Sequence, residues 1–166
     1  MLLFRTIINN PKYSPANAQV IFNRALVALW RIGLIHLLPD MFGAISCPDS
    51  VKMEIDAGSA KYGSIFLSSF EWLTIEPDPP MMQLRKELGA GETAAITLAY
   101  QVKAGLIILD DLAARLVAQE LGLRVTGTIG ILLAANEKNL ITDVKIHFRA
   151  LHDAGFRLPS HIVARI

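Results

Sequence analysis

The sequence predicts a three-layer α/β domain in which a central parallel sheet lies between helices. The first observation is the stretch 88–130, where helical and strand patterns alternate strictly. Such alternation is typical of parallel sheets that are covered by helices. The second is the length of 166 residues, which fits one domain that buries roughly 70% of its unfolded surface. The third is a hydrophobic fraction of 52%, which suits strands buried on both faces.

Composition also limits the classes of function. The apolar run at residues 25–38 contains Arg31 and His36, so it falls short of the roughly 20 apolar residues of a membrane span. The N-terminus lacks the continuous apolar core of a secretory signal, and we expect a cytoplasmic protein without a membrane segment. Cys47 is the single cysteine, which excludes an intramolecular disulfide. A formal charge of +1 gives no general attraction to nucleic acid, so such binding needs a local patch or a metal ion.

The first half of the chain has short elements. Residues 1–17 contain Asn-Pro and Ser-Pro pairs without a sustained period, which predicts an irregular leader before a single domain at 18–166. Short apolar runs indicate strands, and apolar residues three and four positions apart indicate helices. These patterns predict, in order, a strand at 18–22, helices at 24–33 and 35–42, a strand at 44–47, a helix opened by Pro48, a loop at 56–63, a helix at 64–70 and a strand at 72–75.

The second half is more strongly patterned. The proline cluster at 76–80 predicts a turn that leads directly into a helix, which opens at Gly89-Ala90-Gly91-Glu92. Pro159 suits the first turn of a last helix. The elements between and around them are a strand at 106–109, the pair Asp110-Asp111, a helix at 112–121, a strand at 123–125, a Thr126-Gly127-Thr128 turn, and helices at 129–136, 144–154 and 158–166.

Acidic residues stand at the ends of these predicted elements. Asp110 directly follows an apolar strand, where ligands of parallel sheets gather, and Asp111 comes next. Glu92 lies in the first turn of a helix and faces the edge of the sheet where the strands end, which we call the rim. Glu54 lies on the helix after the second strand. Carboxylates gathered at one rim repel one another unless a cation neutralises them. Mg²⁺ or Mn²⁺ is the expected cofactor, because hard divalent ions take oxygen ligands and keep several waters.

Each acid also has a purely structural interpretation. Asp111 can cap a helix, Glu92 can be a favourable first-turn charge, and Glu54 can be a solvated helix position. Asp110 is harder to explain in this way, because the strand needs no acid at its end.

Other candidate residues carry weaker signals. Thr126 and Thr128 follow a strand and open a helix, so their amides and hydroxyls can bind a substrate phosphate or simply cap the helix. Four histidines show no metal-ligand spacing, and no histidine is placed to activate Cys47. The Gly89-Ala90-Gly91 segment follows no strand and lacks the Lys-Ser/Thr pair of a phosphate-binding loop, so it predicts a helix entry.

The segments LGAGETAAITLA, LIILDDLAAR and LGLRVTGTIGILLAA resemble the C-terminal half of PIN-domain proteins, and most closely the uncharacterised VapC-like subgroup. The resemblance covers residues 18–158 and is strong from 88 to 134. It implies a PIN-like fold and a metal-dependent endoribonuclease, often the toxin of a toxin–antitoxin pair. RNA is then the substrate, and a small antitoxin protein is a partner. The high apolar content separately indicates a subunit or partner interface, and a homodimer is the expected assembly.

The resemblance also implies a set of site residues. It places the four acid positions of the family on Asn23, Glu54, Glu92 and Asp110, with Asp111 beside the last. These residues would hold one or two Mg²⁺ or Mn²⁺ ions, which activate a water molecule and stabilise the charge that develops as an RNA phosphodiester is cut.

The sequence departs from the family at the first acid position. Asn23 offers a neutral carbonyl oxygen, and Arg24 stands where the family continues through a Thr-Ser-Pro-Leu-like segment. A positive charge beside the pocket opposes metal binding. On the helix after Asp111, Arg115 can meet a substrate phosphate or remain a solvated charge or ion-pair partner.

Two functions therefore stay open. One is a metal-dependent ribonuclease, and the other is a degenerate PIN domain that binds RNA or a protein partner without cleavage. A third, a small-molecule phosphohydrolase, ranks last because the required nucleophilic aspartate motif is missing.

Overall fold

A central parallel sheet organises the molecule. The computed structural model describes residues 19–84 and 88–164, apart from the Tyr62 side chain, so the predicted leader at 1–17 lies outside the described residues. Five described strands form one sheet in the order β3-β2-β1-β4-β5, and every pairing is parallel. The predicted α/β class is confirmed. The strands are β1 (Gln19–Ile21), β2 (Ile45–Pro48), β3 (Leu73–Glu76), β4 (Leu106–Ile108) and β5 (Val125–Thr126).

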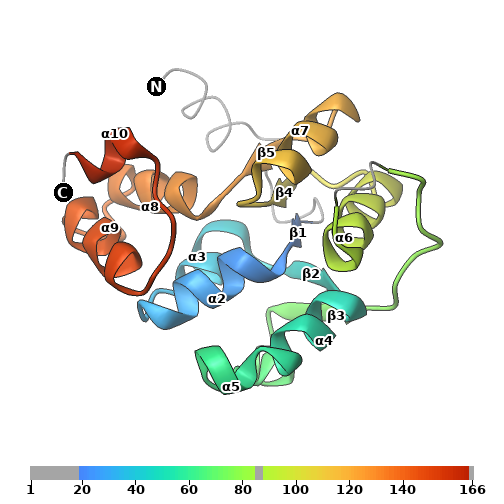
Figure 1. Cartoon of the computed structure of the whole chain (residues 1–166), viewed down its shortest axis with the longest axis horizontal. Coiled ribbons are helices and arrows are strands. Elements are labelled where there is room, and N and C mark those ends of the chain that lie inside the picture. Colours follow the sequence, from blue (N-terminus) through green and yellow to red (C-terminus); the bar gives the residue numbers. More distant parts are fainter. Residues whose placement is uncertain (1–18, 85–87, 165–166) are drawn as a thin grey trace.

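Helices cover both faces of this sheet. In Figure 1, α2, α3 and α8 lie on one side of the strands, and α6 lies on the other. α3 packs against β2, α6 packs against β1, β2 and β4, and α7 packs against β5. The helices are α2 (Asn23–Arg31), α3 (Leu37–Phe42), α4 (Asp49–Ala57), α5 (Ser59–Tyr62), α6 (Ala90–Gln101), α7 (Leu112–Glu120), α8 (Thr128–Glu137), α9 (Val144–Asp153) and α10 (Ser160–Val163). Among the described helices, none has the length and apolar character needed to cross a membrane.

Apart from the buried Gln19, the central strands β1 and β4 are apolar, because helices cover them on both sides. Val20, Ile21, Ile107 and Ile108 are all 0% exposed. A sheet without a solvent face needs no alternation of polar and apolar residues along its strands. Burial of each such side chain contributes about 1.5–3 kcal/mol, so the sheet is a rigid base for the residues that follow each strand.

The strand order reverses between β1 and β4. From β1 the chain moves outward through β2 to β3, and it then returns to the other side of β1 to form β4. Ile21 pairs with Ile108, and the next amide, that of Phe22, donates to the Ile108 carbonyl over 3.1 Å. In open parallel sheets ligands bind at the carboxyl ends of the strands where the order reverses. The segments that follow β1 and β4 therefore border the expected binding crevice.

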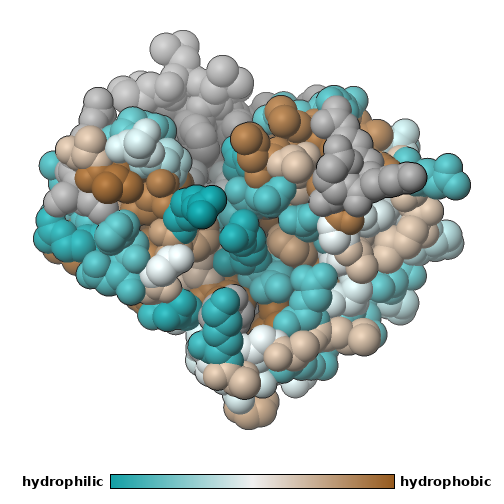
Figure 2. All heavy atoms as spheres, in the orientation of Figure 1, coloured by the Kyte–Doolittle hydropathy of each residue, from teal (hydrophilic) through white to brown (hydrophobic). Residues whose placement is uncertain are grey.

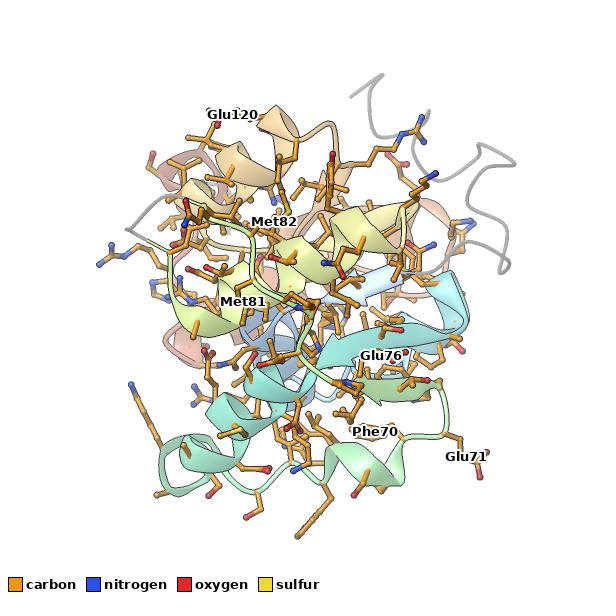
Figure 3. The ribbon with its side chains drawn as sticks, turned by 90° about the vertical axis from the view of Figure 1, so that its right-hand side faces the viewer. Phe70, Glu71, Glu76, Met81, Met82 and Glu120 are labelled. Atoms are coloured by element: carbon orange, nitrogen blue, oxygen red, sulfur yellow. The ribbon has the colours of Figure 1, made fainter. Side chains whose placement is uncertain are left out.

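The return from β3 to β4 passes over the face of the sheet that α6 covers. Irregular chain at residues 77–84 follows β3, and we call this segment the strap. Figure 3 shows that the strap, which carries Met81 and Met82, crosses α6. The Met82 amide donates to the hydroxyl of the buried Thr97 on α6 over 3.3 Å. The expectation that a helix directly follows the prolines is wrong, because irregular chain continues to residue 84 and α6 begins at Ala90. This strap spans the width of the sheet, which a tight turn cannot do.

Two other local predictions in the first half are also wrong. The predicted loop at 56–63 is mostly helical, because α4 continues to Ala57 and α5 follows after Gly58, whose backbone is itself helical (φ −79°, ψ −3°). The predicted helix at 64–70 is a single 3₁₀ turn, Leu67–Ser69. Aromatic packing holds this segment: Phe70 stacks on Trp72 with ring centres 5.1 Å apart and meets Trp30 edge-on at 6.1 Å. Such contacts between distant residues override a short helical pattern.

The last elements differ from the predictions mainly at their ends. β5 begins at Val125 and includes Thr126, so the strand reaches into the predicted turn. The C-terminal helix α10 covers only Ser160–Val163 of the predicted 158–166, and residues 165–166 lie outside the described residues.

Candidate active site

Asn23 and Asp110 lie at the carboxyl ends of the paired strands β1 and β4. Asn23 is the first residue of α2, two positions after β1 ends, and Asp110 stands two positions after β4 ends. Because Ile21 pairs with Ile108, the segments that contain Asn23 and Asp110 leave the sheet at the same edge from neighbouring strands. The two residues therefore border the crevice at the reversal of strand order.

Asp110 is held by Thr128 at the start of α8. The Thr128 amide donates to Oδ1 over 2.8 Å, and its hydroxyl donates to Oδ2 over 2.6 Å. Thr126 and Thr128 are 3% and 0% exposed. Both donors of Thr128 thus serve Asp110, and the structure places this threonine as a positioning residue for the carboxylate. Contact of Thr126 or Thr128 with a substrate stays a prediction.

The pKa of Asp110 reflects opposing influences. Burial raises the pKa above the usual range of an aspartate. The two hydrogen bonds from Thr128 oppose that shift, and the positive charges of Arg115 and Arg24 oppose it as well. Thr128 therefore supports the ionised carboxylate that a cation would need.

Gly127 allows this arrangement because it has no side chain. A Cβ atom at this position would lie 2.6 Å from Oδ1 of Asp110, 2.8 Å from Nη1 of Arg115 and 2.9 Å from the Leu109 carbonyl oxygen. Arg115 donates to that carbonyl over 3.0 Å. The guanidinium predicted to meet substrate is thus bound to the end of β4, beside Asp110, and its contact with a phosphate stays a prediction.

Asp111 has a structural role at the start of α7. Its Oδ1 accepts hydrogen bonds from the amides of Ala113 and Ala114 over 2.9 and 3.1 Å. Its Oδ2 lies 3.9 Å from Nη1 of Arg24. One oxygen thus caps the helix, as the structural interpretation expects, and the other faces Arg24.

Glu92 lies in the first turn of α6, half-buried. Its Oε2 accepts a hydrogen bond from the Gly89 amide over 3.0 Å in a capping box. Burial raises the pKa of Glu92, the Gly89 hydrogen bond opposes this, and the negative charges of Asp111 and Glu54 raise it further. The charges of Asp111 and Glu54 therefore act on Glu92 in the metal-free protein.

Glu54 joins three helices at the same rim. Its Oε1 accepts a hydrogen bond from the Gly91 amide of α6 over 3.1 Å, and its Oε2 accepts one from Nδ2 of Asn23 on α2 over 3.2 Å. The missing side chain of Gly91 makes room, because a Cβ atom there would lie 2.5 Å from Oε1 of Glu54. Glu54 on α4 thus links α6 and α2 and is not a simple solvated helix residue.

Cys47 lies below this rim as an inert core residue. It is 0% exposed, and burial raises the pKa of its thiol to about 12, with further increases from Asp49, Asp78 and Glu54. The thiol stays protonated at neutral pH and is therefore a poor nucleophile.

The ligand types at the rim fit a hard divalent cation. Carboxylates and an amide group surround the crevice, and oxygen ligands of this kind suit Mg²⁺ and Mn²⁺. Within the described ranges, however, no three His, Cys, Asp or Glu side chains converge closely enough to hold a metal ion as they stand. Glu54, Asp110 and Asp111 each accept protein hydrogen bonds in this arrangement. A cation with several retained waters needs fewer direct protein ligands, so the residues fit such an ion without forming a finished cage.

Comparison with known families decides the classification of this fold. A family model described as a PIN domain matches residues 19–166. The chain belongs to the PIN-domain family. No curated protein and no solved structure shows a significant match to it. PIN domains generally have nuclease-type functions, bind RNA and use divalent metal ions.

Sequence reasoning named the acids of this PIN domain but not the residues that hold them. Gly91 and Gly127 each leave space for a carboxylate, and Thr128 fixes Asp110. The only advance signal was local: each glycine adjoins an element end next to a candidate acid. Which carboxylate each one faces depends on contacts between segments 18 to 37 positions apart.

Proposed function

We propose that this PIN domain is a metal-dependent endoribonuclease that hydrolyses RNA phosphodiesters. The observation that supports the proposal is a set of oxygen ligands beyond the carboxyl ends of β1 and β4: Asp110 follows β4, Glu54 accepts a hydrogen bond from Asn23, and the charges of Asp111 and Glu54 raise the pKa of Glu92. Burial and mutual repulsion raise the pKa of Glu92, which is the electrostatic situation that a bound cation relieves.

Glu92, Asp110 and Glu54 would hold the cation, assisted by Asp111 and by the carbonyl oxygen of Asn23. A bound Mg²⁺ or Mn²⁺ supplies an activated water and stabilises negative charge on the phosphodiester. The chain itself contributes orientation: Thr128 fixes both oxygens of Asp110, and the amides of Gly89 and Gly91 fix Glu92 and Glu54. Arg115, beside Asp110, and the Thr126–Thr128 turn are the proposed contacts for substrate phosphate.

The decisive experiment combines calorimetric titration with Mn²⁺ and a cleavage assay on structured RNAs. Wild-type protein should bind Mn²⁺ and cut RNA, and Glu92→Gln and Asp110→Asn should each lower both by at least about tenfold, since each removes a charged oxygen ligand. Lys138→Gln is the matched control, because it removes a charge from an exposed residue at the far end of α8. A wild-type protein that binds Mn²⁺ no more tightly than with a millimolar Kd would contradict the proposal.

The same measurements test the second candidate function, a PIN domain that binds RNA or protein without cleavage. The neutral Asn23 at the first acid position favours this alternative, because it removes one negative charge from the ligand set. Retained RNA binding together with undetectable cleavage at saturating Mn²⁺ would support the non-cleaving function.

We further propose that the protein acts in the cytoplasm as a VapC-like toxin, a homodimer held inactive by a small antitoxin. Figure 2 shows two hydrophobic patches on one face, over α7 and over α8–α10, with hydrophilic surface between them. The exposed apolar side chains on these helices are Leu112, Leu116, Leu133, Ile146 and Val163. Patches of this kind mark partner surfaces more often than chance exposure does.

Two observations test the assembly and the toxin role. Light scattering behind size exclusion should give twice the mass of the 18.2 kDa chain, and a monomer at all concentrations would contradict the homodimer. Expression of the chain should arrest growth, and coexpression of a small neighbouring reading frame should relieve the arrest. Arrest by Glu92→Gln at equal expression would show that growth inhibition does not require the carboxylate site.

A further inference from the structure

Arg24 occupies an unusual place for a positively charged side chain. It is the second residue of α2, and the first turn of this helix contains no acidic residue. A cation at a helix N-terminus opposes the helix dipole, so helix stability does not explain its presence. Its Nη1 lies 3.9 Å from Oδ2 of Asp111, with exposed side-chain fractions of 59% and 35%. The guanidinium therefore lies beside Asp111 while much of the Arg24 side chain is in contact with solvent.

The charge of Arg24 acts on most of the crevice carboxylates. Besides its ion pair with Asp111, it lowers the pKa of both Glu92 and Asp110. Arg115 also lowers the pKa of Asp110, but its guanidinium is bound to the Leu109 carbonyl at the end of β4. Arg24 is thus the arginine placed on the solvent side of the acidic cluster.

We propose that Arg24 is a tethered counterion, which compensates the crevice carboxylates in the metal-free protein and is displaced from Asp111 when a divalent cation binds. This inference rests on the proposed metal-dependent function and adds a control of that site by the chain itself.

The contact with Asp111 has the properties that displacement requires. A distance of 3.9 Å between partly exposed groups is a weak ion pair, and such pairs add little stability. The long arginine side chain can turn into solvent without disturbing the core. A divalent ion and a guanidinium in the same crevice repel each other, so wild-type metal affinity is reduced by the free energy needed to move Arg24 away.

Calorimetric titration with Mn²⁺ at low ionic strength tests the proposal on wild-type protein and on Arg24→Gln, Arg24→Lys, Lys138→Gln and Glu92→Gln. We expect Arg24→Gln to bind Mn²⁺ on the order of tenfold more tightly, because a nearby positive charge is lost. Arg24→Lys keeps the charge and should stay within about threefold of wild type. Lys138→Gln should be unchanged, and added salt should narrow the difference between wild type and Arg24→Gln.

A second readout does not depend on metal. In the presence of EDTA, Arg24→Gln should lower Tm relative to wild type, because the carboxylates lose their counterion. At saturating Mn²⁺, Arg24→Gln should instead have the higher Tm of the two proteins, because tighter Mn²⁺ binding stabilises the folded state more.

The outcomes separate failure of the counterion from failure of the metal site. Suppose that wild type binds Mn²⁺, that Glu92→Gln abolishes this binding, and that Arg24→Gln binds Mn²⁺ no more tightly than wild type. The proposed metal site is then supported, and the proposal that Arg24 is a displaceable counterion is wrong. If neither wild type nor Arg24→Gln binds Mn²⁺, both proposals fail. Unchanged Mn²⁺ affinity with weaker binding of a fluorescent mixed-sequence RNA would make Arg24 a phosphate contact and would overturn the counterion.

Discussion

A single hydroxyl decides how firmly Asp110 is held. The Thr128 hydroxyl donates to Oδ2 over 2.6 Å from a side chain that is 0% exposed. Thr128→Val keeps the shape and the backbone donor but leaves a buried carboxylate oxygen without its partner. We expect a loss of about 1–3 kcal/mol in the free energy of unfolding, measured by urea titration at pH 7.

Thr128→Ser is the matched control for this substitution. Serine keeps the hydroxyl and loses only a methyl group, so it should cost clearly less than valine. Equal losses of stability in both variants would assign the effect to packing. They would contradict the claim that the Thr128 hydroxyl stabilises the Asp110 carboxylate.

At the scale of elements, the start of α6 is shaped by Glu54 on α4. Gly91→Ala would place a Cβ atom 2.5 Å from Oε1 and 2.8 Å from Cδ of Glu54, and both atoms belong to the end of a flexible side chain. Glu54 should move out of the crevice. The loss of its hydrogen bond is offset by the better helix propensity of alanine, so stability should change by less than about 1 kcal/mol.

The displacement of Glu54 should nevertheless weaken Mn²⁺ binding, by about fivefold or more if one carboxylate ligand is lost. Gly89→Ala provides the control, because a Cβ atom there would approach only Oε2 of Glu92, at 3.8 Å. A stability loss of about 3 kcal/mol or more in Gly91→Ala would mean that the backbone moves, and would contradict the expectation that the Glu54 side chain alone gives way.

Element positions show how far local patterns reach. The strands and the helices after Asp110 follow from apolar runs and helical spacing, because these signals arise within a few neighbouring residues. The segment around Leu67–Ser69 was missed because its conformation depends on the packing of Phe70 with Trp30 and Trp72. The start of α6 was placed correctly by its glycines and Glu92, whereas the strap before it depends on contact with Thr97.

For the whole molecule, the crevice acids link stability to pH. Burial raises the pKa of Glu92 and of Asp110, so the folded protein holds these protons more tightly than the unfolded chain does. Their contribution to stability is therefore greatest below the ordinary carboxyl pKa, about 4, and is lost as pH rises through the raised values. The acids thus destabilise the metal-free protein at neutral pH.

Glu92→Gln should reverse part of this effect. Glutamine can still accept the Gly89 hydrogen bond but carries no charge, so Tm in EDTA should rise by about 1–3 °C at pH 7. The gain should disappear below about pH 4, where Glu92 of the wild type is protonated. A gain that is independent of pH, or a lower Tm at pH 7, would show that the cause is not the ionisation of Glu92.

The sequence by itself determined the α/β class, the order of the strands and the positions of Glu92, Asp110 and Asp111 at element ends. These features are local, since periodicity and capping are set by neighbouring residues. Only the tertiary structure decided that β4 lies beside β1, that Asn23 meets Glu54, and that Thr128 holds Asp110. Strand order is set by packing between segments far apart in the chain, so the crevice exists only once the sheet has formed.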